Sequence, residues 1–208
     1  MIILCLQRNS DIMQLKHSPS YTVKPNIMIN FKPLTLEDVS PFYEWINDDI
    51  SIKYSLSIFQ SMHSKEQIDA WFLTVVNDLK NFNRGIFLND TNKLIGYAGI
   101  CNISKLNRSG EYFIFIGDRQ HWAKGLGSQV TQLLLAIGFE KLGLNRIMLT
   151  VSEPNYAAIK AYENAGFKPE GRMRKACFRD NQFHDKLLMS ILKDEWFDRR
   201  DLIKNEDN

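Results

Sequence analysis

The chain has 208 residues, 44% of them hydrophobic and 24% charged, and its 26 Lys and Arg against 24 Asp and Glu leave a formal net charge of +2. This composition excludes a disordered or fibrous chain, and the length suits one compact domain whose core is large enough to support an enzyme site. Because the charges nearly balance, no general field holds nucleic acid or an anionic membrane, and neither is an expected partner.

The cysteines and apolar runs indicate the compartment. Cys5, Cys101 and Cys177 form an odd set without CxxC spacing, so we expect buried thiols rather than disulfides or a metal site. The apolar run at residues 1–6 is too short for a signal peptide, and no apolar window reaches the length of a membrane span. We therefore expect a cytoplasmic protein without a bound metal.

The first half of the chain predicts an extension, two helices and four strands. Residues 1–26 show no periodicity and are expected to precede a domain at 27–208, with Met28 as a second candidate start. A capping-box pattern at Thr35–Asp38 predicts a helix through Trp45, and helical spacing predicts another from Ser64 to about Leu79. Strands are expected at 27–32, 85–88, 94–103 and 111–116, the last three as an antiparallel meander.

The second half changes character. A glycine turn at Gly125–Gly127 is followed by a helix through Leu142, and a strand at 146–151 by a helix from Asn155 to Ala165. Two further strands, at 167–178 and 183–192, and a closing helix at 194–204 complete the pattern. Alternating strands and helices predict an α/β fold.

Two motifs suggest chemistry. In the run 121–129, glycines at a strand-to-helix turn allow backbone amides and the helix N-terminus to bind an anion such as a pyrophosphate. The spacing matches neither an ATP loop nor a dinucleotide fingerprint, and a tight turn without a ligand remains the alternative. Later, Asn155 and Tyr162 share one face of a helix, either as a cap and a core side chain or as site residues.

Taken in order, these motifs resemble the GCN5-related N-acetyltransferase (GNAT) superfamily, in its branch of ribosomal-protein-type acetyltransferases and their small-molecule relatives. The run Trp122-Ala-Lys-Gly-Leu-Gly127 is similar to the family's acetyl-CoA loop, with Trp122 in place of the usual Gln or Arg. Residues 155–167 are similar to the second family signature, and residues 170–185 resemble the branch's closing hairpin. The resemblance covers roughly residues 28–196.

The resemblance implies an α/β (α+β) fold with a mixed, mostly antiparallel sheet of about seven strands, flanked by helices and splayed between its central strands. It implies acetyl-CoA as co-substrate and a primary amine that attacks the thioester directly in a ternary complex. In this fold the amides of residues 124–128 hold the pyrophosphate, the strand end at 115–117 pairs with the pantetheine and offers an N–H to the oxyanion, and Asn155 contacts the pantetheine arm or a structural water. The implied cofactor-binding residues are Phe115, Ile116, Gly117, Trp122, Lys124, Gly125, Leu126, Gly127, Ser128 and Asn155.

Two residues are candidates for catalysis. Tyr162 occupies the family's position for the general acid, and a phenol with a pKa near 10 is protonated at neutral pH. An alkylammonium must lose a proton before it attacks, and Glu111 is the candidate base because it resembles the acidic residue that many relatives have at the start of this strand. An exposed strand-end glutamate without a catalytic role is the alternative, and His121 and His184 are further candidates for the base.

The acceptor is the least constrained feature. A loop is expected at 48–59, between the two predicted helices, and it would help to select the acceptor. No acidic residue occurs from Ser51 to Ser61, which disfavours a polyamine, whereas Tyr54, Phe59 and Trp71 suit an amino sugar. The hairpin side chains Arg172, Arg174, Lys175 and Arg179 suit a nucleotide-linked amino sugar or form a solvated face. A protein N-terminus and an aminoglycoside antibiotic remain open, as does a homodimer, which relatives often form.

A protein of another class also remains open. A CoA-binding sensor without turnover would keep the glycine loop and lose the catalytic side chains, whereas this chain retains Tyr162. We therefore expect an acetyl-CoA-dependent N-acetyltransferase.

Overall fold

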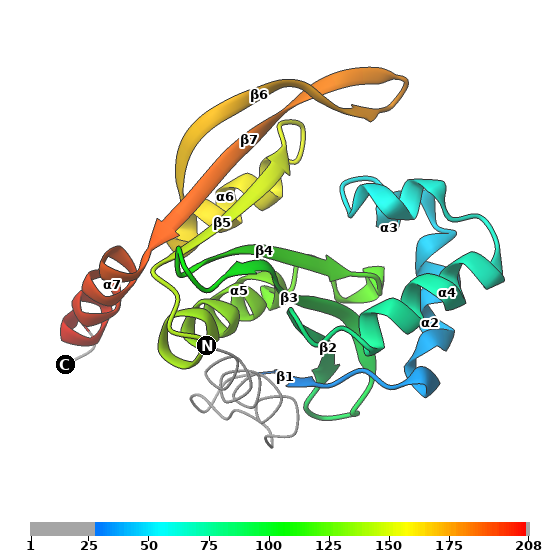
Figure 1. Ribbon diagram of the computed structural model, residues 1–208, viewed down its shortest axis with the longest axis horizontal. Helices are drawn as coiled ribbons and strands as arrows, with labels where there is room; N and C mark the ends of the chain where they lie inside the picture. The colour runs from blue at the N-terminus through cyan, green and yellow to red at the C-terminus, as the bar shows by residue number, and fades with distance from the viewer. Residues whose placement is uncertain (1–27, 207–208) are drawn as a thin grey trace, which may run out of the picture. The chain divides into compact units, whose positions relative to one another are not determined.

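The computed structural model describes residues 28–206, so the expected extension at 1–26 and Cys5 lie outside the described residues (Figure 1). The strands are β1 (Ile29–Lys32), β2 (Phe82–Leu88), β3 (Leu94–Ser104), β4 (Ser109–Ile116), β5 (Arg146–Ser152), β6 (Lys168–Arg179) and β7 (Gln182–Leu192). They form one seven-stranded sheet in the order β1-β2-β3-β4-β5-β7-β6. The β4–β5 pair is parallel, whereas the pairs that β2 makes with β1 and β3, and β7 with β5 and β6, are antiparallel. The predicted mixed, mostly antiparallel sheet is confirmed.

Helices occupy most of the connections between these strands. The α-helices are α2 (Ser40–Ile46), α3 (Asp49–Ile52), α4 (Lys65–Val76), α5 (Leu126–Ala136), α6 (Tyr156–Ala165) and α7 (Lys193–Glu206). Three short 3-10 helices are η1 (Leu36–Val39), η2 (Ser57–Ser61) and η3 (Arg119–His121), and η4 (Ile137–Lys141) continues α5 as a π-helix. Within the described part of the chain, no helix is long and apolar enough to cross a membrane.

The capping box predicted at Thr35–Asp38 forms, and a second one forms at Ser64–Gln67. The Asp38 carboxylate accepts hydrogen bonds from the N–H and the hydroxyl of Thr35, and the Ser64 hydroxyl accepts from the N–H of Gln67, whose side-chain oxygen accepts from the Ser64 N–H. The first helix nevertheless divides into η1 and α2, with Pro41 in the first turn of α2. A proline has no N–H to donate, so it begins a helix more readily than it continues one.

Two expectations about local structure were wrong. The segment 48–59, expected as a loop, contains α3 and the start of η2, because Asp48 caps α3 by accepting from the Ile50 N–H at 3.1 Å. Strand β2 begins at Phe82 rather than at residue 85, because Phe82 pairs with Ile100 in the β2–β3 ladder. Pairing with β3 thus extends the strand over Asn83 and Arg84 despite their polar side chains.

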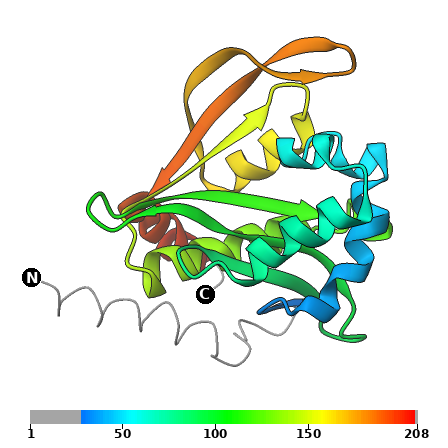
Figure 2. The same cartoon turned by 45° about the vertical axis from the view of Figure 1, so that its right-hand side comes forward.

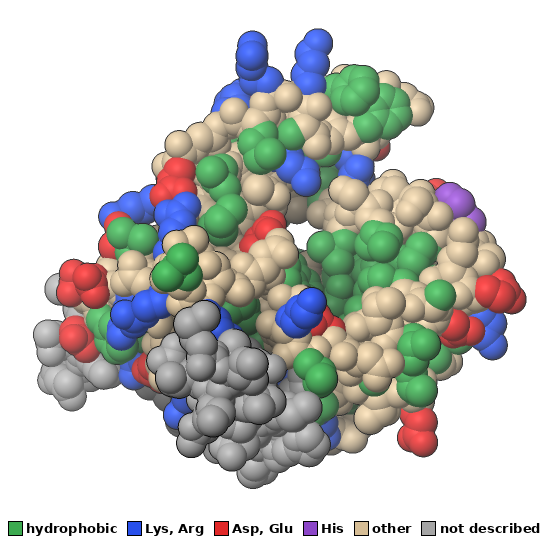
Figure 3. All heavy atoms as spheres, viewed as in Figure 1, with side chains coloured by type: hydrophobic (Ala, Val, Ile, Leu, Met, Phe, Trp, Pro, Cys, Tyr) green, Lys and Arg blue, Asp and Glu red, His purple; other side chains and the backbone are tan. Residues whose placement is uncertain are grey.

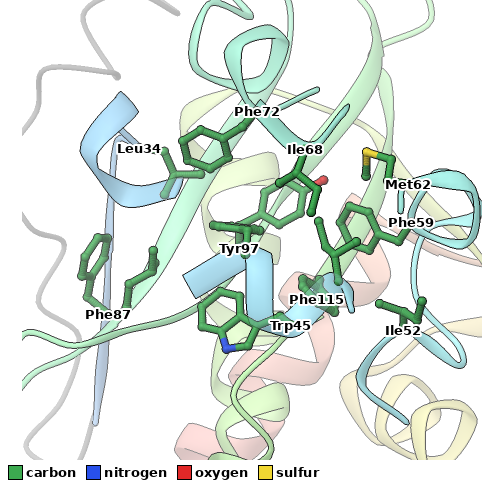
Figure 4. Close-up of a cluster of buried hydrophobic side chains, with 13 residues drawn as sticks. Leu34, Trp45, Ile52, Phe59, Met62, Ile68, Phe72, Phe87, Tyr97 and Phe115 are labelled. Carbon is green, nitrogen blue, oxygen red and sulfur yellow. The ribbon is translucent and has the colours of Figure 1, made fainter. Parts of the chain in front are cut away.

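The described residues form two compact units, the first made of 28–101 and 113–130 and the second of 102–112 and 131–206. In the first unit, aromatic side chains fill the space between the sheet and helices α2 and α4 (Figure 4). Phe42, at the centre, contacts the rings of Trp45, Trp71, Phe72 and Tyr97 with centroids 5.0–5.9 Å apart. These ring contacts, with that of Trp45 against Phe115, fix α2 and the end of β4 against each other.

The second unit is built on β5 and the long β6–β7 hairpin. The β4–β5 ladder covers three residues of each strand, Ser109–Glu111 against Arg146–Met148, and ends there, as expected for a sheet splayed between its central strands. β7 pairs with β5 as far as Lys186 and beyond that point with β6 alone, so the hairpin extends past β5 (Figures 1 and 2). Arg146 of β5 binds Glu170 of β6 and, at 2.8 Å, Ser190 of β7, which ties the three strands together.

Candidate active site

The glycine loop, in the first unit, joins η3 to α5 in a conformation that suits an anion. Gly125 has φ +76° and Ala123 φ +57°, and both fall in the left-handed region. The Gln129 N–H donates to the Gly125 carbonyl at 3.2 Å, which closes the first turn of α5. Leu126, Gly127 and Ser128 form this turn. A helix N-terminus of this kind carries a partial positive charge.

The environment of Gly127 shows whether the loop at 124–128 fits the pyrophosphate of CoA. Gly127 is helical without a positive φ, and a Cβ added there would meet no atom of residues 28–206 within 4 Å. Neither its backbone conformation nor its packing against these residues therefore requires glycine at this position. A glycine in the first turn that the fold does not need is what the close approach of a ligand to the backbone would require.

Trp122 holds the loop onto the strand before it. Its indole Nε1 donates to the Ile116 carbonyl at the end of β4 over 2.8 Å, and its backbone N–H donates to Arg119. The side chain is 39% exposed. The residue predicted to contact the cofactor therefore also has a structural role, because it fixes where the loop leaves the sheet. Leu126 is buried, whereas Lys124 and Ser128 are exposed.

The strand end at 115–117 is held equally tightly. Phe115 is buried in the aromatic cluster, and its carbonyl lies so close to Gly96 of β3 that a Cβ there would come within 2.1 Å of it. A Cβ on Gly117 would come within 2.2 Å of the Trp45 ring. The Ser51 hydroxyl donates to the Gly117 carbonyl at 3.1 Å. This backbone is fixed before any ligand binds, as a preformed oxyanion donor requires.

A carboxylate that the sequence analysis missed organises the approach to the loop. Asp118 is 8% exposed and lies 2.7 Å from Lys93 Nζ and 3.1 Å from His121 Nδ1, and it caps η3 by accepting from the Gln120 N–H at 3.0 Å. Burial alone would raise the pKa of Asp118, but the hydrogen bonds from Lys93 and Gln120 and the charges of Lys93 and His121 outweigh it and lower the pKa.

A second ion pair, between Arg119 Nε and Asp48 at 2.7 Å, holds η3 to the turn before α3. Beside these pairs lies a cavity of about 790 Å³, lined by α2 side chains, the start of β3 and residues 117–120. The sequence signal for this arrangement was the Asp-Arg-Gln-His run directly before the loop, which has no periodicity of its own.

The remaining predicted residues lie in the second unit. Asn155 caps α6 by accepting from the Ala158 N–H at 3.3 Å, so the capping interpretation holds, and this contact uses its side-chain oxygen. Tyr162, two turns along α6, packs edge-on against Tyr112 and Phe167 with centroids 5.8 and 5.9 Å apart. Its hydroxyl makes no hydrogen bond to the described residues and is not among their buried unpartnered atoms. Burial raises the pKa of Tyr162 to about 12.

Glu111 lies where the β4–β5 ladder ends, opposite Met148. Its Oε2 accepts from the Asn102 side chain at 2.9 Å, so it is positioned rather than free in solvent. Neighbouring residues of a strand point to opposite faces, and Tyr112 faces Tyr162. Glu111 therefore lies on the face of β4 opposite the one that meets Tyr162.

The other candidates have structural partners. His184 Nε2 lies 3.2 Å from the Arg179 carbonyl at the hairpin turn, and Cys177 is buried against the Ser152 hydroxyl at 3.2 Å. No group of three or more His, Cys, Asp or Glu side chains suited to a metal ion occurs among residues 28–206.

Comparison with known proteins decides the family. The model of the acetyltransferase (GNAT) domain matches residues 29–168, which is more than half of the chain. The chain belongs to the GNAT acetyltransferase family. It is an N-acetyltransferase, as the names of its relatives agree.

Among these GNAT relatives, the N-acetyltransferase p20 of Bacillus licheniformis is 28% identical over 173 residues, covering 81% of this chain and 94% of p20. Spermidine N(1)-acetyltransferase of Vibrio cholerae is 31% identical over 120 residues, covering 57% of this chain and 69% of that protein.

Solved structures show the same fold. Spermidine N-acetyltransferase from Vibrio cholerae, in complex with CoA and spermine, superposes with a TM-score of 0.73 at 22% identity, covering 82% of this chain and 98% of that one. A GNAT-family acetyltransferase from Bacillus anthracis superposes with a TM-score of 0.70 at 20% identity, covering 85% and 99% of the two chains. At these identities the likeness shows the fold and nothing finer.

Proposed function

We propose that this GNAT N-acetyltransferase transfers the acetyl group of acetyl-CoA directly to a primary amine of a small molecule, within a ternary complex. The observation that carries the proposal is Gly127, a helical glycine at the start of α5 that neither its backbone conformation nor its packing against the described residues requires. A solved GNAT neighbour contains CoA, which agrees with the co-substrate.

The first unit would bind acetyl-CoA. The amides from Lys124 to Ser128, with Gly125 and Gly127 among them, would hold the pyrophosphate, as the backbone at helix N-termini does elsewhere. The strand end Phe115–Gly117 would pair with the pantetheine and offer an N–H to the developing oxyanion. The Ile116 carbonyl accepts from Trp122 and keeps a second lone pair for such pairing.

Asn155 and Tyr162 would serve the pantetheine and the sulfur. The Asn155 oxygen caps α6, which leaves its amide nitrogen as the donor to the pantetheine arm or to a structural water. A thiol has a pKa near 8.5, so a phenol with a pKa of about 12 stays protonated beside the departing thiolate. We assign Tyr162 as the donor that stabilises this thiolate.

Glu111 is proposed as the base that takes the proton from the attacking ammonium, directly or through water. Its place on the face of β4 away from Tyr162 supports this role, because the amine approaches a thioester carbon from one side while the thiolate leaves from another. The hydrogen bond from Asn102 orients the carboxylate.

For the acceptor we propose an amino sugar. Trp71 and Phe113 are partly buried at the edge of the aromatic cluster in the first unit, and such rings suit the apolar face of a sugar. Asp48, a carboxylate that precedes residues 51–61, forms an ion pair with Arg119. A polyamine would need several carboxylates for its charges, yet the spermidine relatives make it the second candidate.

The test is thiol release from acetyl-CoA against amino sugars, nucleotide-linked amino sugars, spermidine, aminoglycosides and peptides with free N-termini. We expect turnover with an amino sugar and little with spermidine. A kcat/KM for spermidine above that of every sugar would reverse the choice of acceptor, and acetyl-CoA binding without turnover of any amine would favour the sensor.

A further inference from the structure

The β6–β7 hairpin contains a wide irregularity that the sheet itself does not need. Met173 pairs with Lys186 and Cys177 pairs with His184, so three residues of β6, at 174–176, face one residue of β7, Asp185. Within this bulge Lys175 has φ +49°, a left-handed conformation that a lysine adopts only at a cost. Bulges of this kind change the direction of side chains and are frequent beside functional sites.

Asp185 holds the bulge in place. Its Oδ1 accepts from the Lys175 N–H at 2.8 Å, and its Oδ2 lies 3.3 Å from Arg172 Nη1. The N–H of Lys175 and the charges of Arg172 and Arg174 lower the pKa of Asp185, although burial raises it. The carboxylate therefore stays ionised at neutral pH.

The same network reaches the turn before α6. Arg172 Nη2 lies 2.7 Å from a carboxylate oxygen of Glu153, whose N–H donates to the Asp185 carbonyl at 3.0 Å. Glu153 is two residues before Asn155, the cap of α6. The bulge is thus tied to the turn before the helix that carries Tyr162.

The structure separates the basic side chains of the hairpin into two kinds. Arg172 is paired with Glu153 and Asp185, and Arg179 donates to the Phe178 carbonyl. Arg174 and Lys175 are exposed and make no ion pair with any described residue. Figure 3 shows Lys and Arg side chains projecting from this hairpin near an apolar group at its tip.

We propose that the bulge at 174–176 binds the anionic group of the acceptor, so that the enzyme acetylates a primary amine that also carries a phosphate. This inference rests on the proposed function, whose acceptor it narrows from an amino sugar to a phosphorylated or nucleotide-linked one. A guanidinium offers paired donors to phosphate oxygens, and the neighbouring ammonium adds a point charge. Arg174 and Lys175 are the specificity residues, and Asp185 positions them.

The first test compares glucosamine 6-phosphate, a uridine-diphosphate-linked amino sugar and glucosamine, in steady-state kinetics. We expect Arg174→Ala with Lys175→Ala to raise KM for at least one phosphorylated acceptor about tenfold or more, the loss of one or two charge-assisted hydrogen bonds. KM for glucosamine and for acetyl-CoA should stay within about twofold. Which phosphorylated amine is affected distinguishes the sugar phosphate from the nucleotide.

The control removes the same charge elsewhere in the second unit. Lys141→Ala with Lys160→Ala deletes two exposed lysines of η4 and α6 and should leave every KM unchanged. Equal effects of the two double variants would overturn the proposal, because general electrostatic attraction would then explain the result. A rise confined to KM for acetyl-CoA would overturn it too, since the bulge would then serve the cofactor.

Asp185→Ala gives a second, opposed test. It makes the protein more positive, so mere attraction of an anion would tighten binding, whereas loss of the bulge geometry should raise KM for the phosphorylated acceptor. Calorimetric binding of glucosamine 6-phosphate and the nucleotide sugar to the wild type and the Arg174/Lys175 variant decides the inference even where no acetyl transfer occurs. Absence of turnover together with such binding would count against the proposed function alone.

Discussion

Tyr162→Phe separates catalysis from packing more cleanly than any other single substitution in this chain. The ring contacts Tyr112 and Phe167, and phenylalanine preserves both contacts. The deleted hydroxyl has no hydrogen-bond partner among the described residues, so its loss should change the free energy of unfolding by no more than about 0.5 kcal/mol. A fixed hydrogen-bond donor aimed at developing negative charge contributes about 10²- to 10³-fold to rate. We therefore expect kcat to fall by that factor, or about 3–4 kcal/mol of transition-state stabilisation.

The assay is thiol release at saturating amine, with the Kd for acetyl-CoA measured by calorimetry and stability by thermal unfolding. Tyr112→Phe is the matched control, since it deletes a neighbouring phenol that is hydrogen-bonded to Thr131 Oγ1 at 2.9 Å. It should cost stability, about 0.5–1.5 kcal/mol, and leave kcat nearly unchanged. Losses in kcat and in acetyl-CoA affinity of the same size for Tyr162→Phe would refute the role at the sulfur.

The pH profile adds an independent check. Burial raises the pKa of Tyr162 to about 12, so the wild-type phenol keeps its proton throughout the range in which an amine acceptor loses its own. The wild-type kcat should therefore not decline up to about pH 10, where an ordinary tyrosine would be half ionised. If the wild-type kcat fell by half at pH 10 and the Tyr162→Phe variant showed no such fall, the pKa of the phenol would not be raised by burial.

Three further outcomes are expected. Gly127→Ala should leave stability equal or raise it by about 0.5–1 kcal/mol, because alanine suits a helix better, while it weakens acetyl-CoA binding about tenfold as its methyl group meets the pyrophosphate; unchanged affinity by calorimetry would remove the loop assignment. Asp118→Asn, which breaks the pair with Lys93, should destabilise the protein by about 1–2 kcal/mol and raise KM for acetyl-CoA more than it lowers kcat; an effect on the melting temperature alone would make Asp118 purely structural. Arg146 holds the pKa of Glu170 down to about 2, so this partly exposed pair stabilises the fold above pH 4.5 and loses its effect as pH falls toward 2. Glu170→Gln should therefore lower the free energy of unfolding by about 0.5–1 kcal/mol at pH 7. In chemical denaturation, this difference from the wild type should vanish at low pH.

Local sequence patterns foretold most elements because their causes are local. The Thr35–Asp38 capping box, the amphipathic spacing of α4 and the closing glycine of α6, Gly166 with φ +102°, each depend on residues within one or two turns. The glycine loop and the Asn155–Tyr162 spacing were visible for the same reason. The short helices in 48–61 were not, because their formation depends on one capping contact of Asp48 and on burial of Phe59.

Contacts between residues distant in sequence escaped the sequence analysis. Lys93 and Asp118 are 25 residues apart, and nothing in either neighbourhood marks the other as its partner. The same holds for Arg146, Glu170 and Ser190, which meet only because β7 lies between β5 and β6 in the sheet. The bulge opposite Asp185 is likewise a property of strand register, which a single strand does not encode.

The sequence by itself determined the class of the protein. The ordered motifs at 122–127, 155–167 and 170–185 resemble those of the GNAT superfamily, and the family model confirms that class. The helices and turns that contain these motifs are visible in the sequence because caps, glycine turns and periodicity act over a few residues. Tertiary structure alone decided which side chains remain available for chemistry. It commits Arg172 and Asn155 to partners, gives the Tyr162 hydroxyl no hydrogen-bond partner among the described residues, and places the exposed Arg174 in a bulge, since burial and pairing arise only when distant strands meet.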